Sequence, residues 1–144
     1  MKRITKIIGT ISNEIIEKYQ LYEYKNIKIV QSLDLYVHIS KHVLEFTSID
    51  SYNKTINNIE NIINDPDFVY YNKKRNSLQY YKKLDENVCI VIKLMLRKNK
   101  NCYIATIYPV SEQKINKIIE QSYIEGRENF YFFTINYQFL HKIF

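Results

Sequence analysis

The sequence predicts an α+β fold in which N-terminal helices precede a four-stranded antiparallel β-sheet, with a further helix and a strand or tail at the C-terminus. Up to residue 64, apolar residues recur at helical spacing. From residue 68 onward, short runs rich in β-branched and aromatic residues replace that spacing. The segments between these runs are short, as they are in antiparallel hairpins. Helices followed by hairpin-linked strands are typical of the α+β class.

Residues 3–21 are predicted to form an amphipathic helix. Polar and charged residues such as Lys6, Glu14 and Glu17 separate the apolar ones, so that one side of the helix would be apolar. The same charged residues interrupt the apolar stretch that a secretory signal peptide needs, and we therefore expect a cytoplasmic protein. The predicted apolar stripe consists of Ile4, Ile7, Ile8, Ile11, Ile15, Ile16 and Tyr19.

Two more helices are predicted after a short extended segment, Ile27–Val30. Ser32 or Asp34 can cap a helix that runs to about Phe46. The next helix has to end before Pro66, because the residue before a proline is pushed out of the helical region. The expected apolar stripes are Leu35, Ile39, His42, Val43 and Phe46 on the first helix, and Tyr52, Ile56, Ile59, Ile62 and Ile63 on the second.

Four strands are predicted in the second half of the chain, and the alternation of side chains assigns their faces. Lys93 is expected to share one face of the third strand with Val91. Thr106 and Tyr108 lie two residues apart and are expected on one face of the fourth strand, together with Ile104. The predicted strands cover residues 68–71, 78–84, 88–96 and 103–110.

Length and composition predict one domain over residues 1–144, with a core at about 27–118 and a C-terminal extension, 119–144. Ser111 can cap a last helix, and residues 129–139 are expected to form a strand or a packed tail. The two glycines exclude the Gly-rich loops that bind phosphates, and the two cysteines are too few for a disulfide framework. Because no apolar run approaches the roughly 20 residues of a membrane span, no contact with a membrane is expected.

An excess of basic residues points to a polyanionic partner. The chain has 21 Lys and Arg against 15 Asp and Glu, a net charge of +6, although an AT-rich genome explains such a composition equally well. Tyrosines interleaved with basic residues are typical of surfaces that bind single-stranded nucleic acid, but strand tyrosines also pack in cores. The candidate substrate-binding residues are Lys73, Lys74, Arg75, Lys82, Lys83 and Arg97.

His38 and His42 lie four residues apart with Lys41 between them, which places both imidazoles on nearly the same face of a helix. Three interpretations stay open. The histidines are partly buried helix residues without chemistry, or they are two ligands of a zinc ion for which Glu45 is the nearest further ligand. Alternatively, they act as general acid and base beside a lysine that binds phosphate.

Lys93, Thr106 and Tyr108 form a second group of candidates. Two hydroxyls from one face of a strand can donate hydrogen bonds to a phosphate, although a half-exposed sheet often carries such a pair without a function. A lysine in the middle of an apolar strand is costly unless its charge faces solvent or an anion. The strands could therefore offer two hydroxyl donors and a cation to a phosphate.

The order of these segments resembles the phage branch of the barnase–EndoU–colicin–RelE nuclease superfamily over roughly residues 27–118. The resemblance implies one or two helices followed by a four-stranded antiparallel sheet. It also implies metal-independent ribonuclease activity, often on tRNA and often as a toxin of phages or bacteria, without a cofactor. The residues that carry it are the helix Leu35–His42, the helix end Ile62–Asp67, and the strand segments Ser77–Lys82, Ile90–Leu94 and Tyr103–Pro109.

By position, the resemblance implies that His42 is the acid–base catalyst of RNA cleavage. In that reaction the 2′-hydroxyl of the RNA attacks the adjacent phosphate, and a 2′,3′-cyclic phosphate results. RNA, including tRNA, and an inhibitor or immunity protein are the implied partners, and an inactive RNA- or protein-binding domain of the same fold is the alternative. The other matching residues are His38 and Lys41 beside the catalyst, Lys93 in the central strand, and the pair Thr106 and Tyr108 in the last strand.

Overall fold

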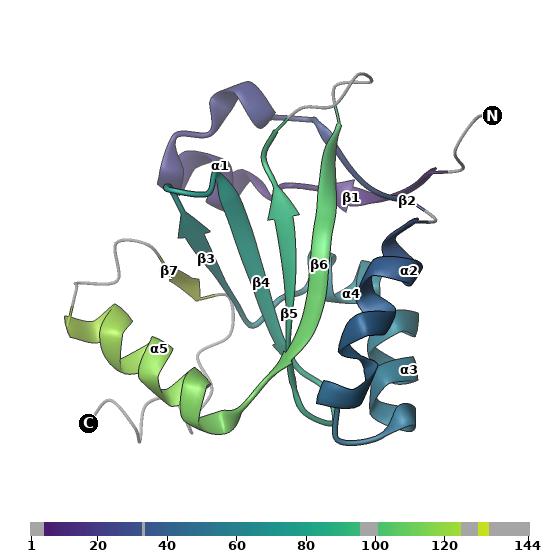
Figure 1. Cartoon of the computed structure of the whole chain (residues 1–144). Coiled ribbons are helices and arrows are strands. Elements are labelled where there is room, and N and C mark those ends of the chain that lie inside the picture. The colour runs from purple at the N-terminus through teal and green to yellow at the C-terminus, as the bar shows by residue number, and fades with distance from the viewer. Residues whose placement is uncertain (1–4, 33, 96–100, 125–129, 133–144) are drawn as a thin grey trace.

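The computed structural model describes residues 5–32, 34–95, 101–124 and 130–132. A seven-stranded sheet with the order β1-β2-β6-β5-β4-β3-β7 forms the centre of the protein (Figure 1). Neighbouring strands are antiparallel except β2 and β6, which run parallel. The strands are β1 (Thr5–Thr10), β2 (Lys28–Ser32), β3 (Phe68–Asn72), β4 (Ser77–Lys83), β5 (Asn87–Lys93), β6 (Cys102–Val110) and β7 (Phe130–Phe132).

The predicted α+β class is confirmed, but the sheet is larger than the four antiparallel strands predicted. Those four strands are present as the consecutive neighbours β6-β5-β4-β3. β1 and β2 extend the sheet beyond β6, and β7 extends it beyond β3. The added strands are short and pair with segments far away in the sequence, so local patterns alone do not reveal their partners.

Helices lie on both faces of the sheet (Figure 1). The helix α5 (Glu112–Ile124) lies at the lower left of Figure 1, beside β7, and packs on one face of the sheet through Ile115 and Ile119. The helix α2 lies beside β6, α3 packs against η2 and α4, and α4 lies behind the sheet. Their bounds, with the 3-10 helices η1 and η2, are α1 (Asn13–Tyr19), η1 (Tyr22–Tyr24), α2 (Asp34–Ile39), η2 (Ser40–Glu45), α3 (Ile49–Asn57) and α4 (Ile59–Asn64).

The N-terminal segment is a strand and a short helix, and the prediction of one helix over residues 3–21 is wrong. Ile7 is 58% exposed and Ile8 is 1% exposed, which is the alternation of a strand. Gly9 has a φ of 155°, a value outside the helical region. The side chain of Ser12 then caps α1 by accepting a hydrogen bond of 3.4 Å from the backbone N–H of Ile15.

The predicted helix over residues 34–46 is present in two parts. An α-helix runs from Asp34 to Ile39, and a 3-10 helix continues from Ser40 to Glu45. The next predicted helix is also divided, because Asn58 leaves the helical conformation between α3 and α4.

Two apolar clusters occupy the two faces of the sheet. The larger cluster packs strand residues such as Ile90 and Ile104 against α1, α2 and α4. The smaller cluster packs Tyr81 and Cys89 against Ile119 of α5. We call the sheet face that carries the smaller cluster the α5 face.

A β-bulge in β6 changes the predicted faces of that strand. Ile92 pairs with Ile104 and Val91 pairs with Thr106, which leaves Ala105 without a partner on β5. The extra residue reverses the alternation of side chains. Ile104 therefore lies in the larger cluster, whereas Thr106 and the residue two positions later lie on the α5 face. The prediction that Ile104 shares their face is wrong.

The C-terminal part of the described chain agrees with two predictions. The Ser111 hydroxyl accepts a hydrogen bond of 3.1 Å from the backbone N–H of Lys114, as expected of a helix cap. Within the predicted strand or tail of residues 129–139, Phe130–Phe132 forms β7 and pairs with β3, and the other residues lie outside the described ranges. In the described ranges, we find no helix that is both long and apolar enough to span a membrane.

Candidate active site

The C-terminal half of β6 is flanked by helices instead of a strand on one side. β2 pairs with β6 at Cys102 and Tyr103, near the start of β6, and further along the strand α2 and η2 lie beside it. This arrangement brings His42 of η2 next to Tyr108 of β6, with 6.3 Å between their ring centroids. His38 and His42 are also 6.3 Å apart, with their rings at 71°. The structure thus brings together three of the predicted site residues.

The turn between β4 and β5 holds the segment that follows η2. One carboxylate oxygen of Glu86 accepts hydrogen bonds from the backbone N–H of Thr47 at 2.9 Å and from its hydroxyl at 3.0 Å. The same oxygen accepts a third bond from the Ser51 hydroxyl at 2.6 Å. Bonds to a charged acceptor are about twice as strong as neutral ones. They anchor η2 at its C-terminal end and thereby position His42.

Glu45 orients the imidazole of His42. Its carboxylate accepts a hydrogen bond from Nδ1 of His42. Because Nδ1 carries the hydrogen in this bond, Nε2 is the nitrogen of the neutral imidazole that can accept a proton. The His42 side chain is 30% exposed, which leaves it accessible to a ligand. Lys41 is exposed beside it on η2.

Thr106 and Lys93 share the α5 face with Tyr108, but their polar groups are engaged differently from the prediction. The Thr106 hydroxyl is buried and has no hydrogen-bond partner among the described residues. The Lys93 ammonium donates a hydrogen bond to the backbone carbonyl of Arg75 in the β3–β4 turn. Contact of either residue with a phosphate therefore stays a prediction.

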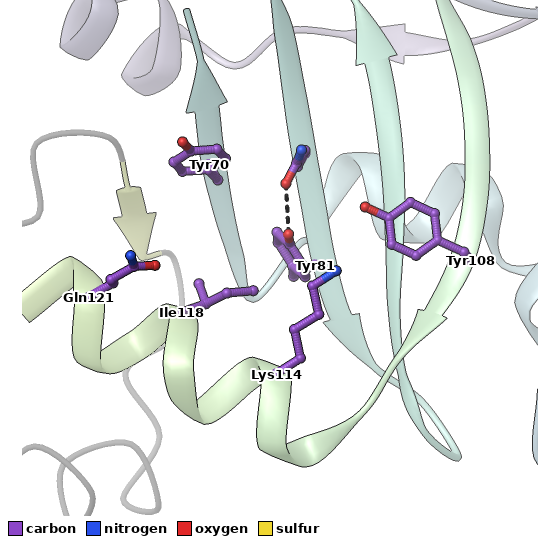
Figure 2. A pocket seen from close by; sticks show the side chains of 7 residues that line it. Tyr70, Tyr81, Tyr108, Lys114, Ile118 and Gln121 are labelled. Carbon is purple, nitrogen blue, oxygen red and sulfur yellow. Dashed lines mark hydrogen bonds between the residues drawn. The ribbon is translucent and has the colours of Figure 1, made fainter. Parts of the chain in front are cut away.

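A pocket of about 330 Å³ opens on the α5 face, between α5 and the strands (Figure 2). Three tyrosine rings come from β3, β4 and β6, and α5 supplies a lysine, an isoleucine and a glutamine. Tyr108 is one of the three tyrosines, so the pocket shares this residue with the His42 site. We call it the tyrosine pocket; its lining residues are Tyr70, Gln79, Tyr81, Tyr108, Lys114, Ile118 and Gln121.

The phenols of the pocket are hydrogen-bond donors. Burial raises the pKa of Tyr81 and of Tyr108 well above the usual value, so both stay protonated in neutral solution. The Tyr81 hydroxyl donates to the side-chain oxygen of Gln79 at 2.7 Å. The Lys114 ammonium lies 5.7 Å from the ring centroid of Tyr108, in the range of a cation–π contact.

Sequence reasoning missed Lys114, Ile118 and Gln121. Their spacing of four and three residues places them on one face of a helix. That spacing is visible in the sequence, but it does not indicate which strand residues this helix face contacts.

The predicted basic surface is divided in the structure. Lys73, Lys74 and Arg75 are exposed together in the β3–β4 turn. Lys82 lies towards the other end of β4, where it donates to the Asp65 carbonyl at 2.6 Å and forms ion pairs with two aspartates. Lys83 pairs with the Glu112 carboxylate at 3.1 Å. Among the described residues, no ion pair neutralises the three basic residues of the turn. Arg97 lies outside the described residues.

Possible metal ligands and the two thiols are the remaining groups to consider in the described residues. No group of three or more His, Cys, Asp and Glu side chains is placed there to hold a metal ion. Burial raises the pKa of the Cys89 thiol to about 12 and that of Cys102 to about 11. Both remain thiols in neutral solution, and a thiol is a poor nucleophile compared with a thiolate.

The comparisons with known proteins give one match. Residues 5–117 match the family described as phage-Barnase-EndoU-ColicinE5/D-RelE like nuclease 3. No curated protein and no solved structure matches the chain. The match covers most of the sheet, both candidate histidines and the first residues of α5. This chain therefore belongs to the phage Barnase–EndoU–ColicinE5/D–RelE-like nucleases.

Proposed function

We propose that this protein is a metal-independent endoribonuclease that cleaves RNA at the junction of η2 and β6. One observation carries the proposal: the imidazole of His42 lies beside Tyr108, and Glu45 holds its Nδ1. Membership in a nuclease family supplies the reaction class. The basic turn at Lys73 to Arg75 supplies a place for the RNA backbone.

His42 acts through Nε2 as a general base. It takes the proton of a ribose 2′-hydroxyl, whose oxygen then forms a bond to the adjacent phosphorus. The bond from phosphorus to the 5′-oxygen breaks, and an acid protonates that leaving oxygen. His38 is the second titratable group, 6.3 Å from His42 between ring centroids. The products are a 2′,3′-cyclic phosphate and a 5′-hydroxyl.

Cations near His42 stabilise the charge that develops on the phosphate. Lys41 is exposed on η2, and Lys114 lies over the Tyr108 ring. We assign Lys93 a positioning function instead, because its ammonium holds the basic turn through the Arg75 carbonyl.

Cleavage of a short single-stranded RNA and of tRNA tests this proposal. We expect products with a 2′,3′-cyclic phosphate, formed also in the presence of EDTA. The substitution His42→Ala should lower the cleavage rate by about a hundredfold to ten-thousandfold, the usual contribution of a general acid or base. It should change RNA affinity much less, because proton transfer acts in the transition state.

The substrate itself provides the control. An RNA with a 2′-deoxy sugar at the cleaved position should bind but resist cleavage, because its nucleophile is gone. Equal cleavage of both substrates would overturn the mechanism. If EDTA abolishes cleavage and added zinc restores it, the histidines are metal ligands instead. If neither substrate is cut while RNA still binds, the protein is an inactive RNA-binding member of the family.

A further inference from the structure

Part of the wall of the tyrosine pocket lies beyond the residues that the family match covers. Tyr108 lines the pocket and also lies beside His42, so the two sites share this residue. Ile118 and Gln121 lie beyond residue 117, where the match ends. This wall of the pocket is therefore a feature of this chain and not one that the family alone predicts.

We propose that the tyrosine pocket binds one unstacked nucleotide of the RNA, next to the phosphate cleaved at His42, with Lys114 on a phosphate oxygen of that nucleotide. This inference rests on the proposed function, because it names a subsite of the same reaction.

The pocket has the size and the walls that a nucleobase needs. Its volume of about 330 Å³ lies in the range of pockets for small molecules. Tyrosine rings and Ile118 give it flat apolar walls, and a base that stacks on an aromatic ring gains about 1–3 kcal/mol. The Tyr81 ring is held in place from behind, where it stacks on Phe68 at 4.6 Å between centroids.

Lys114 and Gln79 supply hydrogen-bond donors to the pocket. The side-chain oxygen of Gln79 already accepts from the Tyr81 hydroxyl, so the amide nitrogen of Gln79 is left to donate. Figure 2 shows the Lys114 ammonium between Tyr81 and Tyr108. These donors suit the carbonyl oxygens of a base and the oxygens of a phosphate.

Neither the phosphate nor the base of a nucleotide would by itself find partners for both the polar groups and the apolar walls of the pocket. A phosphate would pair with Lys114 and leave the apolar ring surfaces in contact with water. An uncharged apolar ligand would leave the Lys114 ammonium and the Gln79 amide without partners, which is costly when they are desolvated. A nucleotide meets both requirements, because it joins a flat ring with carbonyl groups to an anion.

Titration followed by NMR tests the pocket without any need for cleavage. The probes are uridine 3′-monophosphate, uridine and inorganic phosphate, and the readout is the side-chain amide signals of Gln79 and Gln121. We expect uridine 3′-monophosphate to shift both signals in a saturable manner. Uridine and inorganic phosphate should each bind at least tenfold more weakly, because each makes half of the contacts.

A pair of lysine variants on α5 provides the matched comparison. Lys114→Gln should weaken the binding of uridine 3′-monophosphate about tenfold or more, since it removes a charged partner of the phosphate. It should leave the affinity for uridine unchanged. Lys117→Gln removes the same charge three residues further along, outside the pocket, and should leave both affinities unchanged.

Three results would overturn the nucleotide pocket: no saturable shift of the Gln79 signal, equal binding of inorganic phosphate, or equal weakening by the two lysine variants. The last would indicate unspecific attraction to a basic surface. If the protein cleaves RNA but fails this titration, the proposed function stands and the nucleotide pocket is refuted. If it binds uridine 3′-monophosphate but cleaves no RNA, the nucleotide pocket stands and the proposed function is refuted.

Discussion

The hydrogen bond from Nδ1 of His42 to Glu45 gives a prediction for a single residue, which rests on the proposed function. The substitution Glu45→Gln replaces the carboxylate that holds Nδ1 with a neutral amide. The imidazole then loses its fixed orientation and its preferred tautomer. We expect the cleavage rate to fall, but by less than the hundredfold to ten-thousandfold expected for loss of the imidazole itself, while KM stays nearly unchanged.

Glu60→Gln is the matched control for Glu45→Gln. Glu60 is an exposed glutamate on α4, and its ion pair with Lys6 spans 3.8 Å at the surface. Single-turnover rates and thermal unfolding of both variants separate a positioning effect from a loss of stability. Equal rates for Glu45→Gln and the unchanged protein would remove Glu45 from the mechanism.

The buried Cys89 thiol gives a prediction about alkaline pH. Burial raises its pKa from the usual 9.0 to about 12. An unfolded chain releases this proton near pH 9, whereas the folded chain keeps it to about pH 12. The unfolded state therefore binds fewer protons in this window, and the free energy of unfolding falls as pH rises. Tyr81 and Tyr108 act in the same direction, because burial raises their pKa values as well.

Cys89→Ala removes one of these titrating groups. We expect it to reduce the slope of unfolding free energy against pH, by up to about 1.4 kcal/mol per pH unit, between pH 9 and 12. Between pH 6 and 8 the slopes of the two proteins should coincide. Urea unfolding at several pH values measures both slopes, and identical slopes above pH 9 would contradict the prediction.

At the scale of elements, Gly9 distinguishes the strand from the helix that the spacing predicted. Gly9 has a φ of 155°, and a Cβ at this position would lie 2.7 Å from the side-chain oxygen of Asn64. Asn64 is held there because its amide nitrogen donates to the Ile8 carbonyl at 3.1 Å. In a strand, Gly9→Ala should therefore lower the free energy of unfolding by about 1–3 kcal/mol.

In a helix the same substitution would raise stability by about 1 kcal/mol, because alanine is the better helix former. The sign of the change in urea unfolding thus decides between the two structures of this segment. Thr10→Ala at the exposed neighbouring position is the control and should change stability little.

The strands and helices of the central part were predictable because each depends on nearby residues. Short connectors mark the hairpins of β3, β4 and β5, and Pro66 forces the end of α4. The bulge at Ala105 was not predictable, because the alternation of apolar residues fits a strand with or without a bulge. Only the pairing with β5 reveals the extra residue.

At the scale of the whole molecule, the charge of the β3–β4 turn should determine RNA affinity. Lys74 is exposed in this turn beside two other basic residues. Each lysine that contacts a phosphate releases a counterion, so Lys74→Gln should weaken RNA binding and reduce the slope of log affinity against log salt by about 0.7–1. Fluorescence anisotropy at several salt concentrations measures this slope.

Lys6→Gln is the control for the turn. It removes the same charge from β1, where Lys6 is 63% exposed and pairs with Glu60. An equal reduction of the slope by both variants would mean that net charge alone attracts the RNA. In that case the basic composition, and not the turn, explains binding.

The sequence by itself determined the α+β class, the four central strands, the cap at Ser111 and the family, because these depend on local spacing and on the order of segments. It also proposed His38, His42 and Tyr108 as candidates, and the fold brings these three together. Only the tertiary structure decided that Thr5–Thr10 form a strand, that Lys93 donates to the Arg75 carbonyl, and that α5 lines a pocket with Tyr108. Each of these depends on contacts between residues far apart in the chain, and such contacts leave no periodic pattern in the sequence.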